Sequence, residues 1–121
     1  MRRSILALSM LLVGSAAFGQ AKTMAKDEKL LAQAKALYTR SKAAFVKNPK
    51  DSKIKKGYID ATVSFGTISM NSPVLTPKQK YPQALKLYRE ALKIDPKNEI
   101  ALNNKKMIES IYKSMNRPIP Q

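Results

Sequence analysis

The sequence predicts an all-α fold of four helices paired as two antiparallel hairpins. Apolar side chains recur three and four residues apart through most of the chain, a spacing that places them on one face of a helix. Proline or polar turn residues break this spacing at 48–51, 71–81 and 95–98. Two of the breaks contain the same Pro-Lys pair, at Pro49 and Pro96, 47 residues apart. A unit of helix, proline turn and helix that recurs in this way indicates a stacked helical array.

Residues 1–19 have the three-part layout of a secretory signal peptide. Two arginines precede an apolar run that ends at Val13, and small residues follow up to Gly19. The run is about half the roughly 20 residues that a membrane-spanning helix needs, so a cleaved leader is favoured over an anchor. We expect cleavage after Gly19, with Ala21 as the alternative, and export to the periplasm or the extracellular space.

Residues 20–116 are expected to form one helical domain. Asp51 or Ser52 can cap the helix after the first proline turn, and Asn98 can cap the helix after the second, since these residue types are common at helix N-termini. The predicted helices cover residues 24–47, 52–70, 82–94 and 98–115.

The connector over residues 71–81 is long for a helical hairpin. Inside it, the segment Thr76-Pro77-Lys78-Gln79 has the pattern of a capping box, which indicates a short helical turn. Residues 117–121 contain two prolines and are predicted to be a short non-helical tail.

The composition excludes the commonest catalytic and metal-binding groups. The 121 residues include no His and no Cys, so the chain has no imidazole base, thiolate, disulfide or Cys/His zinc site. Only eight residues are Asp or Glu, and nothing in their spacing pairs them for acid–base catalysis. We therefore expect no catalytic residue, no metal ion and no cofactor, and a protein that is not an enzyme.

The segment that ends at the second proline break resembles the second helix of the tetratricopeptide repeat family. Small residues at Ala84 and Ala91, an aromatic at Tyr88, Leu92 and the closing Pro96 follow the family pattern almost position for position. The small residues let a neighbouring helix approach closely, and the aromatic side chain fills the gap between hairpins.

The resemblance is weaker outside residues 82–98. In the preceding helix, Phe65-Gly66 stands where the family has a leucine–glycine pair, with Gly66 removing a side chain at the helix crossing. In the last helix Lys105-Lys106 replaces that pair, which fits a polar capping helix. The resemblance therefore implies one complete repeat between two half-repeats, a tetratricopeptide-like α-solenoid fragment.

Members of this family are mostly scaffolds that bind proteins or peptides along the concave surface formed by the first helix of each pair. The resemblance therefore implies a non-catalytic protein–protein interaction module. Ordinary solvated or half-buried roles for the residues at these positions stay open. Carried over residue by residue, the concave surface consists of Asp60, Val63, Thr67, Asn103, Met107 and Ser110.

The formal net charge of +15 supports a second interpretation. Lysines recur on the expected exposed face of every helix, and no acidic residue lies between Asp60 and Glu90. Such a surface attracts anionic partners over long range. The alternative function is therefore a cationic polyanion- or envelope-binding protein, although lysines that only keep the protein in solution fit the pattern equally. The candidate residues for a polyanion site are Lys78, Lys80, Lys86, Arg89, Lys93 and Lys97.

The expected partner is a protein or peptide of acidic character, or an anionic glycan or lipid surface. Lysine greatly outnumbers arginine, and bidentate recognition of phosphates and bases uses arginine, so dedicated nucleic-acid reading is disfavoured. Self-association into a homo-oligomer stays open, because repeat arrays need about three units to cover their helix faces.

Overall fold

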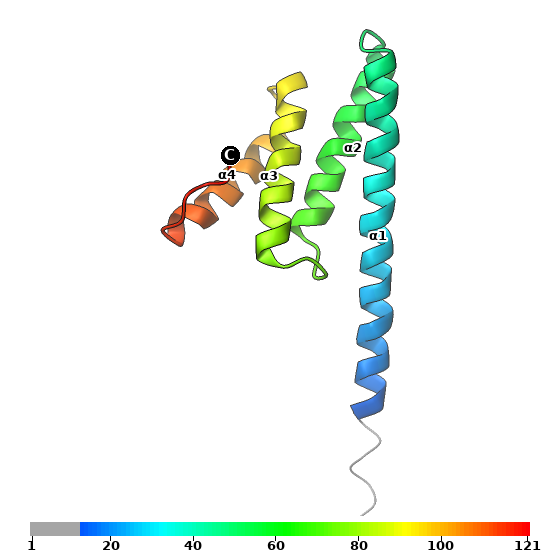
Figure 1. The fold of residues 1–121 in the computed structure, drawn as a ribbon, viewed down its shortest axis with the longest axis vertical. Coiled ribbons are helices and arrows are strands. Elements are labelled where there is room, and N and C mark those ends of the chain that lie inside the picture. Colours follow the sequence, from blue (N-terminus) through cyan, green and yellow to red (C-terminus); the bar gives the residue numbers. More distant parts are fainter. Residues whose placement is uncertain (1–12) are drawn as a thin grey trace, which may run out of the picture.

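The computed structural model describes residues 13–121, with side chains from Lys22 onward. Four α-helices follow one another, α1 (Val13–Lys47), α2 (Ser52–Met70), α3 (Pro77–Ile94) and α4 (Glu99–Ser114), and no strand occurs between residues 13 and 121. Each helix packs chiefly on its neighbours in sequence, with α1 at one end of the row and α4 at the other (Figure 1). The prediction of an all-α helical-repeat fold is confirmed.

Helix α1 is longer than the sequence analysis predicted. It begins at Val13 instead of residue 24 and continues through the expected cleavage site, because no proline interrupts it before Pro49. Its N-terminal part projects well beyond the other helices (Figure 1). The first twelve residues of the predicted signal peptide lie outside the described residues. In the part of the chain that the structure describes, no helix combines the length and apolar character that crossing a membrane requires.

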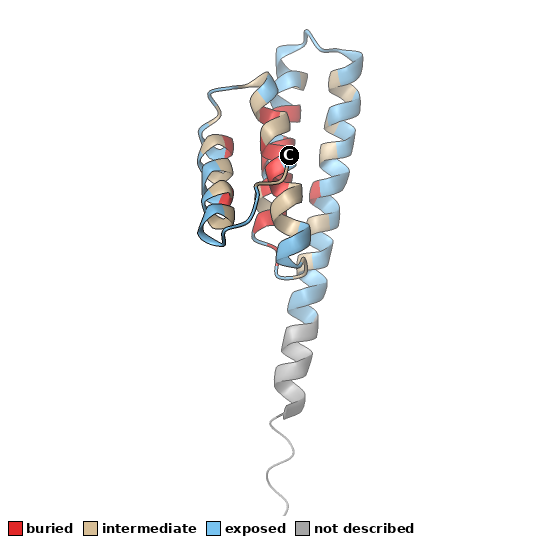
Figure 2. Ribbon diagram, turned by 60° about the vertical axis from the view of Figure 1, so that its left-hand side comes forward, coloured by how far each residue is buried: buried red, intermediate tan, exposed pale blue. Residues whose placement is uncertain are grey.

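Helix α2 is the centre of the molecule. Asp51 caps it, since the side-chain Oδ1 accepts hydrogen bonds from the backbone N–H groups of Lys53 and Ile54 at 2.9 and 3.1 Å. Nine of its 19 residues are buried, because α1 covers one side and α3 another. The buried residues gather along the middle of the molecule, while most of α1 is exposed (Figure 2).

Helix α3 begins at Pro77, five residues earlier than predicted. The backbone N–H of Thr76 donates to Oε1 of Gln79 at 3.0 Å, so the capping-box segment starts α3 itself and does not form a separate turn. Pro82 lies inside the helix and removes one backbone hydrogen bond. The helix continues because Ala84 and Leu85, the next residues to face the core, are completely buried.

The core has a larger and a smaller part. The larger part joins α2, α3 and α4 around Leu85, Tyr88 and Ile108, all fully buried. The smaller part joins α1 to α2 and α3, and Ala34 is the one residue of α1 that it buries in the described range. Aromatic contacts across the α1–α2 interface add to it, including Phe45 and Tyr58, whose rings lie nearly parallel at 4.9 Å between centroids.

The C-terminal tail folds back onto the helices. Asn116 has a φ of 56°, the left-handed conformation that asparagine tolerates at a helix end. The backbone N–H of Arg117 donates to the carbonyl of Tyr112 at 3.0 Å, a Schellman-type bond that turns the chain around. Ile119 then packs against the larger core, and Nη1 of Arg89 donates to the carbonyl of Pro120 at 2.7 Å. The tail is non-helical, as predicted, and it also covers part of α3.

Tyr88 packs directly against Gly66 where α3 crosses α2. A Cβ atom at position 66 would lie 3.0 Å from Cε1 of Tyr88 and 3.3 Å from two further ring atoms. The ring cannot easily move aside, because it is fully buried and its hydroxyl is hydrogen bonded to Thr67 and Asn104. Glycine at this position therefore allows the two helices to approach, as the sequence pattern implied.

We expect Gly66→Ala to lower the free energy of unfolding by about 1–3 kcal/mol, because the added methyl group overpacks the crossing. Gly57 is the matched control in the same helix, since a Cβ there would meet no atom within 4 Å. Gly57→Ala should raise the free energy of unfolding by about 0.5–1 kcal/mol through the higher helix propensity of alanine. Urea unfolding followed by circular dichroism measures both; equal stabilisation by the two variants would contradict the role given to Gly66.

Candidate functional site

A groove of about 350 Å³ lies where α2 meets the beginning of α4. Val63 and Ile68 supply apolar side chains from α2, and Ile100 supplies another from α4 while remaining 57% exposed. We call this site the α2–α4 groove, and its lining consists of Asp60, Val63, Ser64, Thr67, Ile68, Asn98 and Ile100.

The structure brings together half of the residues expected on the concave surface. Asp60, Val63 and Thr67 line the α2–α4 groove. Val63 is 6% exposed and belongs to the larger core, so it forms the floor of the groove and offers little surface to a partner. The three expected residues of α4, Asn103, Met107 and Ser110, are exposed and do not line the groove.

The sequence analysis missed four residues of the groove, Ser64, Ile68, Asn98 and Ile100. A signal for Ile100 was present, because it is an apolar residue beside the buried line of α4 and therefore points to a different side of the helix. Asn98 was assigned only as a cap, and it does accept a hydrogen bond from the backbone N–H of Ala101 at 3.0 Å. Its place beside α2 depends on how the turn is folded, which no local pattern indicates.

Tyr88 holds Thr67 in place at the edge of the groove. Its hydroxyl and that of Thr67 are 2.9 Å apart and hydrogen bonded, and Nδ2 of Asn104 donates to the Tyr88 hydroxyl at 3.0 Å. Burial raises the pKa of Tyr88, and the two hydrogen bonds oppose that effect. Thr67 is thus held in one orientation at the edge of the groove.

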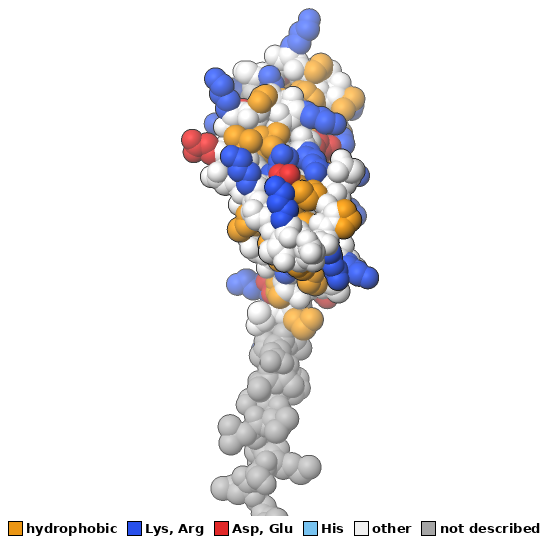
Figure 3. Space-filling model, turned by 90° about the vertical axis from the view of Figure 1, so that its left-hand side faces the viewer, with side chains coloured by type: hydrophobic (Ala, Val, Ile, Leu, Met, Phe, Trp, Pro, Cys, Tyr) orange, Lys and Arg blue, Asp and Glu red, His pale blue; other side chains and the backbone are white. Residues whose placement is uncertain are grey.

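Basic side chains surround a second hollow, of about 500 Å³, between α3 and the tail. We call it the tail hollow, and it is lined by Pro82, Lys86, Arg89, Glu90, Lys93, Pro120 and Gln121. It contains three of the six residues expected to bind polyanions, and of these Arg89 is engaged with the tail. Lysine and arginine side chains are spread over the α4 side of the molecule with apolar groups between them (Figure 3).

The other three candidates for polyanion binding do not line the tail hollow. Lys78 lies in the first turn of α3. The ammonium group of Lys80 lies 5.5 Å from the centre of the Tyr81 ring. Lys97 lies in the turn between α3 and α4. The structure therefore groups part of the predicted basic set and disperses the rest.

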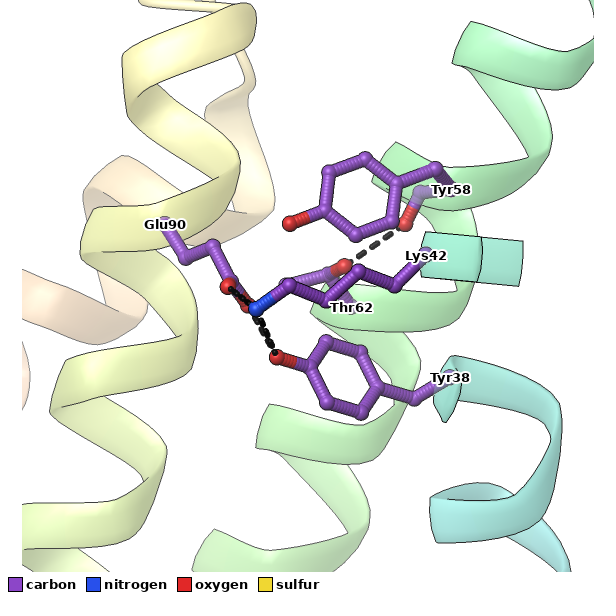
Figure 4. A network of polar contacts seen from close by, with 5 residues as sticks. All are labelled: Tyr38, Lys42, Tyr58, Thr62 and Glu90. Atoms are coloured by element: carbon purple, nitrogen blue, oxygen red, sulfur yellow. Dashed lines mark hydrogen bonds and ion pairs between the residues drawn. The ribbon is translucent and has the colours of Figure 1, made fainter. Parts of the chain in front are cut away.

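A polar cluster joins α1 to α3 across α2 (Figure 4). The Tyr38 hydroxyl donates to Oε2 of Glu90 at 2.6 Å, and Nζ of Lys42 donates to Oε1 of Glu90 at 2.7 Å. Nζ of Lys42 also donates to the Tyr38 hydroxyl at 3.3 Å, and the hydroxyl of Tyr58 points toward the same carboxylate. We call Tyr38, Lys42 and Glu90 the Glu90 cluster.

The electrostatics of the Glu90 cluster favour its charged form. Burial acts to raise the pKa of Glu90, but the hydrogen bonds from Lys42 and Tyr38 outweigh it and hold the pKa below the ordinary value. The hydrogen bond to Glu90 in turn raises the pKa of Lys42. Burial, followed by the charge on Glu90, raises the pKa of Tyr58 to about 12. Lys42 and Glu90 form an ion pair, so the cluster links α1 to α3 without adding net charge.

The described residues offer no metal site of the usual kind. Within them, no group of three or more Asp, Glu, His or Cys side chains lies close enough together to hold a metal ion. The architecture is instead that of a helical-repeat scaffold, in which stacked helices present grooves between them.

Comparison with known families agrees with this class. A family model described as a TPR repeat, the tetratricopeptide repeat, matches residues 74–105, which span the end of the connector, all of α3 and the first half of α4. The match confirms the predicted tetratricopeptide repeat over these residues. Searches of curated proteins and of solved structures returned no significant match. Such repeats typically act as non-catalytic interaction modules, so the match suggests a protein–protein interaction module.

The Glu90 cluster makes stability depend on pH in the acid range. The carboxyl group has a lower pKa in the folded protein than its ordinary value of 4.5. Its contribution to stability is therefore complete above about pH 4.5 and is lost as the pH falls through the folded pKa. Glu90→Gln should lower the free energy of unfolding at pH 7 by about 1 kcal/mol, since Lys42 is partly exposed.

Urea unfolding at pH 7 and at about pH 3 tests this, with the difference between native protein and variant expected to shrink toward zero in acid. Glu109→Gln is the control, because its partner Lys105 lies one turn away in the same helix at 3.2 Å and its side chain has the same 24% exposure as Glu90. It should cost only about 0.3–0.5 kcal/mol. A Glu90→Gln difference that is unchanged in acid would refute the assignment.

Proposed function

We propose that this protein is exported and binds a segment of a partner protein in the α2–α4 groove. The observation that carries the proposal is Ile100, an apolar side chain left 57% exposed beside the apolar floor formed by Val63 and Ile68. Exposed apolar surface with a polar rim is typical of interaction sites. The signal-peptide layout of residues 1–19 supports export.

The lining of the groove indicates the chemistry of the bound segment. The apolar floor suits one inserted apolar side chain, while Ser64, Thr67 and Asn98 offer hydrogen-bonding groups to a peptide backbone. Asp60 is the one charged residue of the lining, whereas the chain as a whole carries +15. A segment with an apolar anchor and acidic flanking residues therefore fits best, because the long-range field attracts the flanks.

The test is capture of binding proteins from an envelope extract on purified native protein and on Ile100→Asp. We expect the variant to retain at most about one tenth of the bound partner, since an anchor contact is worth at least about 1.4 kcal/mol. Val46→Asp is the matched control, because Val46 is also an exposed apolar residue, 71% exposed, but lies on α1. A partner that both variants capture equally well binds elsewhere, and the proposal would then be wrong.

The tail hollow supports polyanion binding as a second candidate function. Lys86 and Lys93 face it from α3, and Glu90, the acid in its lining, is already paired with Lys42 at 2.7 Å. An excess of positive charge is therefore left beside a hollow of about 500 Å³. A phosphate-rich or sulfate-rich polymer is the matching class of ligand.

Inorganic polyphosphate is the probe for this candidate. The double variant Lys86→Gln/Lys93→Gln should weaken its binding at least about fivefold more than Lys53→Gln/Lys56→Gln, which removes the same charge from the first turns of α2. Binding is measured at about 0.1 M and again at about 1 M salt, where the screening length falls from roughly 10 Å to 3 Å. Equal loss in both double variants would show that only net charge matters.

A further inference from the structure

A groove of about 420 Å³ runs between α1 and α3, and it shares no lining residue with the α2–α4 groove. Its apolar surface comes from four different segments of the chain: Leu31 of α1, Phe65 of α2, Leu75 of the connector and Leu87 of α3. Phe65 and Leu87 belong to the smaller core, at 6% and 5% exposure, so they form a fixed floor. We call this site the α1–α3 groove.

The groove exists because α1 and α3 both pack on α2 and not on each other. In the described residues their backbones stay apart, and the Glu90 cluster bridges them at one end. Tyr38 and Glu90 of the cluster are themselves part of the lining of the groove. Leu31 and Leu75 also line the groove and are only half-buried, so they offer apolar surface to a ligand.

The charges at the rim favour an anion. Lys35 of α1 and Lys86 of α3 both line the groove and are exposed, and Lys86 also lines the tail hollow. The acids of the lining are Glu90, which Lys42 neutralises at 2.7 Å, and Glu28, which is exposed one turn before Leu31. Because Lys42 neutralises Glu90, Lys35 and Lys86 are left against Glu28 alone, and the rim carries one more positive than negative charge. The stems of lysines lie readily along apolar surface while the ammonium groups stay in water.

We propose that the α1–α3 groove binds a single-chain anionic amphiphile, a fatty-acid carboxylate of medium length. Its hydrocarbon chain would lie on Leu31, Phe65, Leu75 and Leu87, and its carboxylate between Lys35 and Lys86. The volume is within the range of about 300–1,000 Å³ that is usual for small-ligand sites. An apolar floor with a few polar groups at the rim is also the usual composition of such sites. The site is separate from the partner-binding groove proposed above.

Dodecanoate, kept below its micelle concentration, is the probe. Purified full-length protein should bind one molecule per chain with a dissociation constant below about 100 µM, measured by calorimetry. Ala32→Trp tests the location, because Ala32 is an exposed residue of the lining and a large side chain there fills the groove without removing any core contact. Affinity should fall at least about tenfold.

Ala36→Trp is the matched control, since Ala36 is exposed on the same helix but does not line the groove. Its affinity should stay within about twofold of the native value. Circular dichroism verifies that both variants keep their helices. If Ala32→Trp does not fold, Lys35→Glu is used in its place. Lys93→Glu is then the control, because Lys93 lines the tail hollow and not the α1–α3 groove.

Amphiphiles with the same hydrocarbon chain and different head groups test the role of the ligand's charge. We expect dodecanoate to bind more tightly than dodecanol, and dodecanol more tightly than dodecyltrimethylammonium, with Lys35→Glu abolishing the preference for the carboxylate. No binding of dodecanoate, equal binding by Ala32→Trp, or equal binding of the cationic amphiphile would each overturn the proposal. A stable dimer in sedimentation that dodecanoate does not dissociate and that Ala32→Trp abolishes would also overturn it, since a second copy would then fill the groove.

Discussion

The arrangement of α2, α3 and α4 depends on the side chain of Tyr88. Its ring fills the space left by Gly66, and its hydroxyl bonds to Thr67 of α2 and Asn104 of α4, so one residue of α3 fixes the positions of both neighbouring helices. A fully buried phenol is tolerated only because its oxygen is satisfied on both sides. This contact also fixes one side chain of the α2–α4 groove, since Thr67 is both a hydrogen-bond partner of Tyr88 and part of the lining.

Local patterns in the sequence predicted the features that are determined locally. The helix fold, the cap at Asp51, the contact between Gly66 and the following helix and the repeat over residues 82–98 all follow from spacing and residue type. The same reasoning placed the start of the third helix at Pro82, and it gave no indication that the helix would begin earlier and continue through the proline.

Features that depend on contacts distant in sequence could not be predicted. Glu90 bonds to Tyr38 and Lys42, which lie 52 and 48 residues away, and charge counting cannot identify such pairs. The return of the tail depends on the left-handed conformation of Asn116 and on a place for Ile119 in the core. Half of the expected concave surface failed to line the α2–α4 groove for a related reason, since the turn before α4 decides which residues of that helix face α2.

Because each helix packs chiefly on the helices next to it in sequence, the helices differ in how readily they unfold. Helix α1 packs on α2 with its C-terminal part (Figure 1) but, among the residues that the structure describes, buries only Ala34 below 10% exposure and reaches α3 through side chains alone. The buried apolar contacts that hold α1 are therefore fewer than those that join α2, α3 and α4, and we expect α1 to open at a lower free energy than the rest of the molecule. Amide hydrogens of α1 should then exchange with solvent through this partial opening, and those around the fully buried Tyr88 more slowly.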